Sequence, residues 1–250
     1  MSVTRVGVLG AAGRMGSEVV KAVETDPALE LACGLDVGDR LEHLLESGAE
    51  VIVDFTSPDV VMSNLDFCAA HGIHAVVGTS GFTPDKLEVV ERLLGDEPTT
   101  GFLIAPNFGI AAVLMMQFAA QAAPYFESVE IVELHHPKKI DAPSGTARRT
   151  AEMIGAAREA AGSEPMPDAT TDELPGARGA LVDGVHIHSA RILGMIAHQE
   201  VLFGGPGELL TIRHDSMNRE SFMPGVVLGV KEVANHPGLT VGLELFLNLA

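Results

Sequence analysis

The sequence predicts an α/β fold in which a parallel, doubly wound sheet is followed by an α+β half. Strand-like and helix-like segments alternate over residues 1–109, as they do in parallel sheets covered by helices. Three strand-like runs joined by Gly-containing turns follow residue 184, and such runs are typical of an antiparallel or mixed sheet. The two halves are therefore expected to differ in architecture.

The elements of the first half follow from apolar runs separated by polar and Gly-rich turns. The run Val51-Ile52-Val53, for example, is typical of a strand buried in a parallel sheet. We expect strands over 3–9, 29–35, 51–56, 75–77 and 102–105, and helices over 17–23, 58–70 and 84–94.

The second half is expected to contain helices and a sheet with one helix layer. Residues 162–180 are rich in Pro, Gly, Asp and Thr and predict a long surface loop. Because a sheet needs cover on both faces, self-association through its other face is expected. We expect helices over 110–123, 144–161 and 220–234, strands over 128–134, 185–193, 197–203 and 208–213, and a closing segment over 242–249.

A glycine-rich turn follows the first predicted strand. Gly10 would permit a tight turn, Gly13 would let backbone amides approach a pyrophosphate, and Gly16 would let the following helix pack on the strand. Asp36 ends the second strand, where an acid can accept hydrogen bonds from ribose hydroxyls. The alternative is a loop glycine cluster beside a surface Asp. The strand, turn, helix and acid in register favour a Rossmann-type dinucleotide site.

The choice of nucleotide depends on the residues around Asp36. Val37 follows it, so no Arg stands there to receive a 2′-phosphate, which favours NADH over NADPH. Arg14 could nevertheless receive a phosphate. Three further loops follow predicted strands, at 54–57, 78–81 and 106–109. Because ligands of such sheets bind beyond the carboxyl ends of the strands, we expect these loops on the nicotinamide side. The alternative is that these three loops are ordinary turns that bind no ligand.

Composition excludes several classes of partner. Lys plus Arg is 16 and Asp plus Glu is 34, so the formal net charge is 16 − 34 = −18, which repels nucleic acid and anionic membranes. No apolar run is long enough to span a membrane. The N-terminus lacks the features of a signal peptide, and we expect a cytoplasmic protein. Cys33 and Cys68 lie in apolar segments and predict reduced thiols rather than a disulfide or metal site.

Positive charge gathers in the segment ELHHPKKIDAPSGTA, residues 133–147. Ser144 is a predicted N-cap, so the amides of Gly145 and Thr146 would lie at a helix start that favours a carboxylate. Lys139 would add a charge, and the paired histidines 135 and 136 could donate protons near neutral pH. This combination suits a small dianion that is held at one end and protonated at the other.

Metal binding and a purely structural role are the alternatives for these histidines. Adjacent histidines do not readily bind one metal ion, and no further ligand stands at suitable spacing. His186 and His188 alternate along one strand. Because no third ligand is evident, we expect them to lie on a solvated face of that strand. No metal is therefore expected.

The same segment, together with GAAGRMG, VDFTSP, VVGTSGF and APNFG, resembles bacterial dihydrodipicolinate reductase (4-hydroxy-tetrahydrodipicolinate reductase) of the lysine and diaminopimelate pathway. The resemblance implies a Rossmann domain of residues 1–109 plus 220–250, a substrate-binding and tetramerisation domain inserted at 110–219, and a homotetramer. It also implies hydride transfer from NADH or NADPH to a small dicarboxylate substrate, which yields tetrahydrodipicolinate.

The resemblance also assigns roles to individual residues. His135 is expected to be the proton donor and Lys139 its charged companion. His136, Gly145 and Thr146 are expected to hold a substrate carboxylate. Expected cofactor contacts are Gly10, Ala12, Gly13, Arg14, Met15, Gly16, Asp36, Phe55, Thr56, Gly78, Thr79, Ser80, Pro106, Asn107 and Phe108.

Two other functions remain open on the sequence. One is a different small-substrate NAD(P) dehydrogenase, such as an amino-acid or imine reductase. The other is a non-catalytic NAD-binding regulator whose basic loop binds a partner protein. Such a regulator would bind NADH without consuming it and would tolerate loss of His135.

Overall fold

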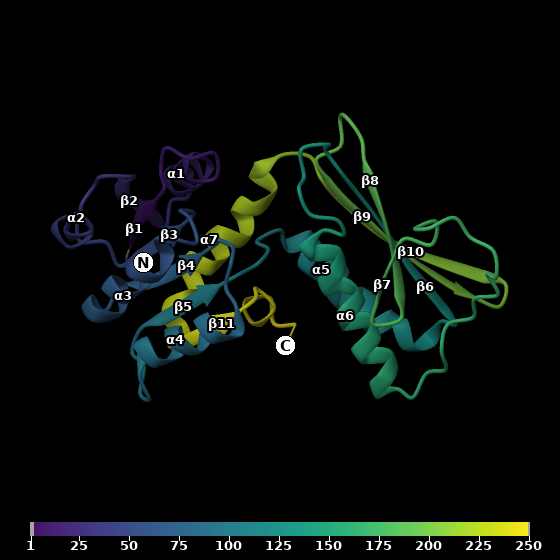
Figure 1. The fold of residues 1–250 in the computed structure, drawn as a ribbon. Coiled ribbons are helices and arrows are strands. Elements are labelled where there is room, and N and C mark those ends of the chain that lie inside the picture. The colour runs from purple at the N-terminus through teal and green to yellow at the C-terminus, as the bar shows by residue number, and fades with distance from the viewer. Residues whose placement is uncertain (1–2, 250) are drawn as a thin grey trace. The chain divides into compact units, whose positions relative to one another are not determined.

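The computed structural model describes residues 3–249 and divides into two compact units. One unit contains the chain up to Ile110 and from Arg219 onward, and the other contains Ala111–Asn218. Figure 1 shows the elements of each unit. Among the described residues, none of the helices has both the length and the apolarity to cross a membrane.

The first unit is built on a six-stranded parallel sheet, which confirms the predicted fold class. Its strands lie in the order β11-β5-β4-β3-β1-β2. All four residues of β3 and of β5 are buried, as expected for strands covered on both faces. The strands are β1 (Thr4–Leu9), β2 (Leu29–Leu35), β3 (Val51–Asp54), β4 (His74–Val77), β5 (Gly101–Ile104) and β11 (Gly238–Val241).

Helices pack against this sheet, and α7 approaches it closely. A Cβ on Gly229 of α7 would stand 2.8 Å from a methyl carbon of Leu103, so a larger side chain has no room there. Thr83 caps α4 by accepting a hydrogen bond from the Lys86 amide at 3.4 Å. The helices are α1 (Gly16–Thr25), α2 (Glu42–Glu46), α3 (Val61–His71), α4 (Pro84–Leu94) and α7 (Met223–Glu232), with short 3₁₀ turns η2 (Arg219–Phe222), η3 (Val233–Asn235) and η4 (Leu245–Leu247).

Several predicted boundaries are wrong. The helix expected from residue 58 begins at Val61, because residues 58–60 form a turn. The helix expected over 220–234 consists of the 3₁₀ turn η2, the helix α7 and the 3₁₀ turn η3. The short helix α2 and the strand β11 are additional elements.

The second unit contains a mixed five-stranded sheet in the order β10-β9-β6-β8-β7. Strands β6 and β8 are parallel, and the other pairs are antiparallel. Its elements are α5 (Ile110–Ala122), η1 (Ala123–Tyr125), β6 (Ser128–His135), α6 (Gly145–Ala160), β7 (Ala180–Val182), β8 (Val185–Arg191), β9 (Ala197–Gly205) and β10 (Glu208–Ser216). The strand expected over 185–193 ends at Arg191. The strands expected over 197–203 and 208–213 extend to Gly205 and Ser216, and β7 was not expected.

The two faces of this sheet differ in polarity and cover. Helices α5 and α6 lie on one side of it (Figure 1), and Gln199 of β9 donates to Thr150 of α6 at 2.8 Å. By strand register, Leu181, Leu202 and Leu209 share the opposite face. Their exposed fractions are 63%, 37% and 84%. This face therefore presents apolar side chains that the protomer itself does not bury.

Candidate active site

The glycine turn after β1 has the geometry that the sequence predicts. Gly10 has φ +79°, and a Cβ there would stand 2.9 Å from the Phe55 carbonyl oxygen. A Cβ on Gly16 would stand 2.0 Å from the Gly10 carbonyl oxygen, so α1 can start here only without a side chain. A Cβ on Gly13 would meet the same oxygen at 3.0 Å. The backbone of α1 thus lies directly against the turn.

Asp36 joins the end of β2 to this turn. Its Oδ2 accepts a hydrogen bond from the Ala12 amide at 2.7 Å. The amides of Gly10 and Ala11 donate to the Leu35 carbonyl at 2.8 and 3.2 Å. Asp36, Ala12 and Arg14 are exposed. The exposed carboxylate of Asp36 is therefore fixed beside the glycine turn, where an acid can contact a ribose.

Asp54 forms hydrogen bonds with the loops that follow β3 and β4. Its buried carboxylate accepts hydrogen bonds from the Thr56 amide at 2.9 Å and from the Thr56 hydroxyl at 2.6 Å. The hydroxyl of Thr79, in the next loop, donates to the same oxygen at 2.8 Å. Asn64 of α3 donates to the other oxygen at 2.8 Å. One carboxylate thus fixes the positions of two predicted cofactor residues.

Phe55 brings a third loop into contact with these two. A Cβ on Gly78 would stand 2.1 Å from a ring carbon of Phe55, so the ring packs against the bare Gly78 backbone. The rings of Phe55 and Phe108 have centroids 5.9 Å apart at an angle of 57°. Asn107 accepts a hydrogen bond from the Gly109 amide at 2.8 Å. The loops after β3, β4 and β5 therefore form a continuous surface.

All the predicted cofactor residues lie at one edge of the parallel sheet, beyond the carboxyl ends of five adjacent strands. Those after β1 are Gly10, Ala12, Gly13, Arg14, Met15 and Gly16; Asp36 follows β2; Phe55 and Thr56 follow β3; Gly78, Thr79 and Ser80 follow β4; and Pro106, Asn107 and Phe108 follow β5.

His135, the last residue of β6, is held by a buried carboxylate in the second unit. Its Nδ1 lies 2.5 Å from Glu133 Oε2. The side chain of His135 is 12% exposed, and that of Glu133 is fully buried. Burial alone would raise the pKa of Glu133, but hydrogen bonds from His135, Arg191 and Ser189 outweigh it and lower that pKa to about 2. Glu133 is therefore ionised near neutral pH and can only accept hydrogen bonds.

Arg191 and Ser144 complete the surroundings of Glu133. The guanidinium of Arg191, on the neighbouring strand β8, donates to both carboxylate oxygens at 2.8 Å. It also donates to the Asp141 carbonyl at 2.7 Å. The Ser144 amide donates to Glu133 Oε1 at 3.2 Å. The same carboxylate thus contacts the histidine and the residue that begins helix α6.

The start of α6 matches the predicted capping but differs in one respect. Ser144 accepts a hydrogen bond from the Ala147 amide at 3.2 Å, as expected of an N-cap. The carboxylate of Asp141, however, lies 2.7 Å from Lys139 Nζ. Burial would raise the pKa of Asp141, but hydrogen bonds from Lys139 and from the Gly145 amide lower it overall. An anion of the same loop thus already neutralises part of the positive charge that the sequence places there.

The predicted substrate residues therefore fall on one short segment that runs from the end of β6 into the first turn of α6. His136 and Gly145 are exposed, and Lys139 and Thr146 are partly buried. The Lys139 amide donates to the His136 carbonyl at 3.1 Å, which curves the loop after the strand.

His186 and His188 lie on the open face of the sheet, and they are only partly exposed to solvent. Both are partly buried, and each is paired with a carboxylate. His188 Nε2 lies 2.7 Å from Glu130, and His186 Nε2 lies 3.8 Å from Asp168. Within residues 3–249, no three His, Cys, Asp or Glu side chains come together as a metal site.

Glu133 and Arg191 are site residues that the sequence reasoning missed. Glu133 stands two positions before His135, and alternate residues of a strand share a face, so its proximity could have been inferred. Arg191 carries no such local signal, because it reaches Glu133 only through the parallel pairing of β6 with β8.

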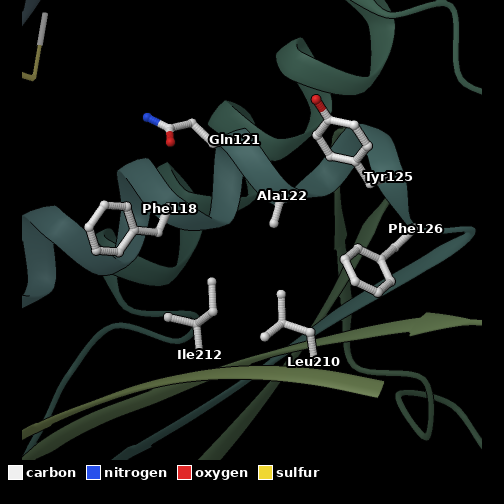
Figure 2. Close-up of a pocket in the computed structure, with 7 residues that line it drawn as sticks. All are labelled: Phe118, Gln121, Ala122, Tyr125, Phe126, Leu210 and Ile212. Carbon is white, nitrogen blue, oxygen red and sulfur yellow. The ribbon is translucent and has the colours of Figure 1, made fainter. Parts of the chain in front are cut away.

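A separate apolar groove lies between α5 and β10 in the second unit (Figure 2). None of the predicted catalytic or substrate residues lines it. The rings of Phe118 and Phe126 and the side chains of Leu210 and Ile212 point toward the groove. Its lining residues are Phe118, Gln121, Ala122, Tyr125, Phe126, Leu210 and Ile212.

Comparison with known proteins identifies the family. Residues 4–108 match the family described as dihydrodipicolinate reductase, N-terminus, and residues 111–247 match dihydrodipicolinate reductase, C-terminus. The chain is 63% identical to a 4-hydroxy-tetrahydrodipicolinate reductase of Streptomyces griseus subsp. griseus over all of both chains. It is 61% identical to that of Nocardia farcinica, over 98% of this chain and 99% of the relative.

Solved structures agree with these matches. A dipicolinate-bound dihydrodipicolinate reductase from Paenisporosarcina sp. TG-14 has a TM-score of 0.86 and 41% identity, covering 97% of this chain and 99% of its own. An amine dehydrogenase from Mycobacterium smegmatis shares the fold, with a TM-score of 0.62 and 14% identity over 96% of this chain and 95% of its own. With both of its units matched and its relatives aligned from end to end, the chain belongs to the dihydrodipicolinate reductase family.

Proposed function

We propose that His135 is the proton donor in the reduction of 4-hydroxy-tetrahydrodipicolinate to tetrahydrodipicolinate by this chain, with NADH or NADPH as hydride source. The chain is an oxidoreductase of its family, and this reduction is a step of lysine and diaminopimelate biosynthesis. One observation carries the assignment to His135. Its imidazole is held through Nδ1 by the buried carboxylate of Glu133, at the end of a strand that leads to the start of α6.

The start of α6 supplies the binding of a substrate carboxylate. This helix contains 16 residues, and the aligned dipoles of its peptide units favour an anion at its N-terminus. Asp141 illustrates the local preference for an anion, because Lys139 Nζ lies 2.7 Å from its carboxylate and its pKa is lowered overall despite burial. We assign His136, Gly145 and Thr146 to one carboxylate of the substrate, and Lys139 to the charge that develops during reduction.

The proton is delivered from the other nitrogen of His135. Because an ionised carboxylate can only accept, Nδ1 carries a hydrogen that it donates to Glu133. Loss of water from the 4-hydroxyl group and ring carbon 3 of the substrate would give the conjugated dihydrodipicolinate. A bound nucleotide would supply hydride to its ring carbon 4, and the imidazolium of His135 would release its Nε2 proton to ring carbon 3. A general acid in this position contributes a factor of ~10²–10⁴ to the rate.

The residues of the first unit fit a pyridine nucleotide. Side chains at Gly10 and Gly16 would meet carbonyl oxygens of the protein itself, so glycine is needed there for the tight turn and for the close start of α1. The exposed Gly13 between them would let a pyrophosphate approach the backbone. Asp36 would contact the adenosine ribose. Its carboxylate would repel a 2′-phosphate, and Val37 beside it is fully exposed and uncharged. We therefore propose that NADH is preferred over NADPH.

The test follows the near-ultraviolet absorbance of the reduced nicotinamide in the presence of freshly prepared substrate. The wild-type chain is expected to consume nucleotide only when substrate is added, and faster with NADH than with NADPH. His135→Gln should keep its affinity for NADH and lose a factor of ~10²–10⁴ in kcat. Unchanged turnover in this variant would remove His135 from the mechanism.

We also propose that the chain forms a homotetramer through the open face of the second sheet. The exposed leucines on β7, β9 and β10 support this proposal, because association of protomers would bury apolar side chains that one protomer leaves in water. Leu209→Glu should lower the mass measured by light scattering without unfolding the protomer. A wild-type monomer, or an unchanged mass for the variant, would contradict this interface.

A further inference from the structure

We infer that Glu133 and Arg191 form a positioning pair, which fixes the tautomer and orientation of the His135 ring and ties that ring to the N-terminus of α6. The inference rests on the proposed role of His135 as proton donor. Neither residue is assigned to contact the substrate. Both would act on the reaction through His135.

The geometry gives Glu133 a complete set of partners. Its fully buried carboxylate lies 2.5 Å from His135 Nδ1 and receives two hydrogen bonds from Arg191 at 2.8 Å. A guanidinium that donates to both oxygens holds a carboxylate in one plane, which a single-point cation does not do. The position of the carboxylate in turn sets the plane and the rotation of the imidazole.

The chemistry of the carboxylate selects one tautomer of the neutral ring. Because Glu133 can only accept, the hydrogen of neutral His135 resides on Nδ1, and Nε2 carries the lone pair. Protonation then occurs at Nε2, the nitrogen that we assign to the substrate. After the proton is transferred, the ring returns to the same neutral tautomer, so each turnover begins and ends with the same contact to Glu133.

The pair also connects the proton donor to the carboxylate-binding segment. Glu133 accepts from the amide of Ser144, which caps α6, and Arg191 donates to the Asp141 carbonyl. The two ends of the loop between Asp141 and Ser144 are thus attached to the two members of the positioning pair. We therefore expect the distance between donor and bound carboxylate to be set by this pair.

The same strand provides a matched comparison on its other face. Glu130 of β6 also pairs with a histidine and an arginine, His188 at 2.7 Å and Arg178. Glu130 is partly buried rather than fully buried. None of its partners belongs to the proposed site. Glu130→Gln therefore removes an equivalent charge from the same strand without touching the positioning pair.

The experiment measures kcat, KM and the tautomer of His135 in Glu133→Gln, Arg191→Lys and Glu130→Gln. Nitrogen NMR of histidine-labelled protein distinguishes the two ring nitrogens, and the His135 signals are those absent from His135→Gln. In Glu133→Gln the side-chain amide would donate to Nδ1, so the hydrogen of the neutral ring should move to Nε2. We expect kcat to fall by about 10- to 100-fold in this variant, as for other groups that orient a functional histidine.

Arg191→Lys and Glu130→Gln refine the result. Arg191→Lys keeps the carboxylate, so the tautomer should persist while kcat falls by a smaller factor. Glu130→Gln should change neither. Because Glu130 lies on the open face of the sheet, the mass of this variant by light scattering should also equal that of the wild type. If Glu133→Gln does not fold, Arg191→Lys still tests the inference. A kcat of Arg191→Lys equal to that of the wild type would overturn it.

The outcomes separate this inference from the proposed function. An inactive His135→Gln with a Glu133→Gln variant that retains wild-type kcat and tautomer would refute the positioning pair and leave the proton donor in place. An active His135→Gln would refute both. Equal losses of kcat in Glu133→Gln and Glu130→Gln would also refute the pair, since the effect would then be one of general charge.

Discussion

Gly145 permits a test in which protein stability and ligand binding are expected to change in opposite directions. It is the first residue of α6, its φ is not in the left-handed region, and a Cβ there would meet nothing within 4 Å. The fold therefore does not require glycine at this position. Replacing it by Ala restricts the unfolded chain and should stabilise the folded state by about 0.4–1 kcal/mol.

A carboxylate ligand, in contrast, should be disturbed by that methyl group. If the Gly145 amide holds one carboxylate of the substrate, Gly145→Ala would weaken a hydrogen bond to a charged group. Such bonds contribute ~1.5–3 kcal/mol, which corresponds to an increase of about 10- to 150-fold in the dissociation constant. Dipicolinate is a suitable unreactive probe, and calorimetry with the reduced nucleotide present measures its affinity.

Gly155, on the same helix, is the matched control. A Cβ there would stand 2.7 Å from the backbone oxygen of Asp183, so Gly155→Ala should lower the free energy of unfolding in urea. Its effect on stability should thus have the opposite sign to that of Gly145→Ala. Unchanged dipicolinate affinity in a stabilised Gly145→Ala variant would refute the assignment of this amide to the substrate. A destabilised Gly145→Ala variant would refute the local geometry.

Two further predictions concern the glycine turn and the buried carboxylate. Gly16→Ala places a methyl group 2.0 Å from the Gly10 carbonyl oxygen, so it should lower both NADH affinity and the free energy of unfolding. Fluorescence titration with NADH and unfolding in urea measure the two effects. Unchanged NADH affinity would contradict the turn geometry. Glu133 has its pKa lowered from 4.5 to about 2, so its stabilisation is present above pH 4.5 and is lost as the pH falls from 4.5 to about 2. The free energy of unfolding would fall by about 3 kcal/mol at most. Glu133→Gln should therefore show a weaker dependence of this free energy on pH over that interval than the wild type. Parallel curves of unfolding free energy against pH for the two proteins would contradict the prediction.

The parallel sheet could be predicted because most of its strands have a local signal. Val51–Asp54 and Gly101–Ile104 are short apolar runs that end in polar or Gly-rich loops, and each is followed by a helix. β11 has no comparable signal. Gly238–Val241 is four residues long and only partly buried, and it becomes a strand by pairing with β5. Pairing between distant segments is not visible in a local pattern.

The same contrast between local sequence signals and pairing of distant segments applies to the candidate site. His135, Lys139 and Gly145 could be found because they lie within one unusual segment, and Gly10 and Gly16 because their spacing reflects steric limits in the turn. Arg191 could not, because it lies 58 residues from Glu133 and arrives there through strand pairing. The role of Asp141 was missed for a different reason. Composition indicated where positive charge gathers, but not that an acid of the same loop neutralises part of it.

The strand β11 also imposes an order on synthesis. The inserted unit is continuous along the chain and has all its strands once residue 216 has left the ribosome, whereas the six-stranded sheet needs residues 238–241. At ~5–20 residues per second, translation from Ile110 to Val241 takes roughly 7–26 s. During that interval β5 has an open edge, whose unpaired amides and carbonyls can pair with another nascent chain. Slow translation of the second half of the message would therefore lengthen the period in which the first half is prone to aggregate.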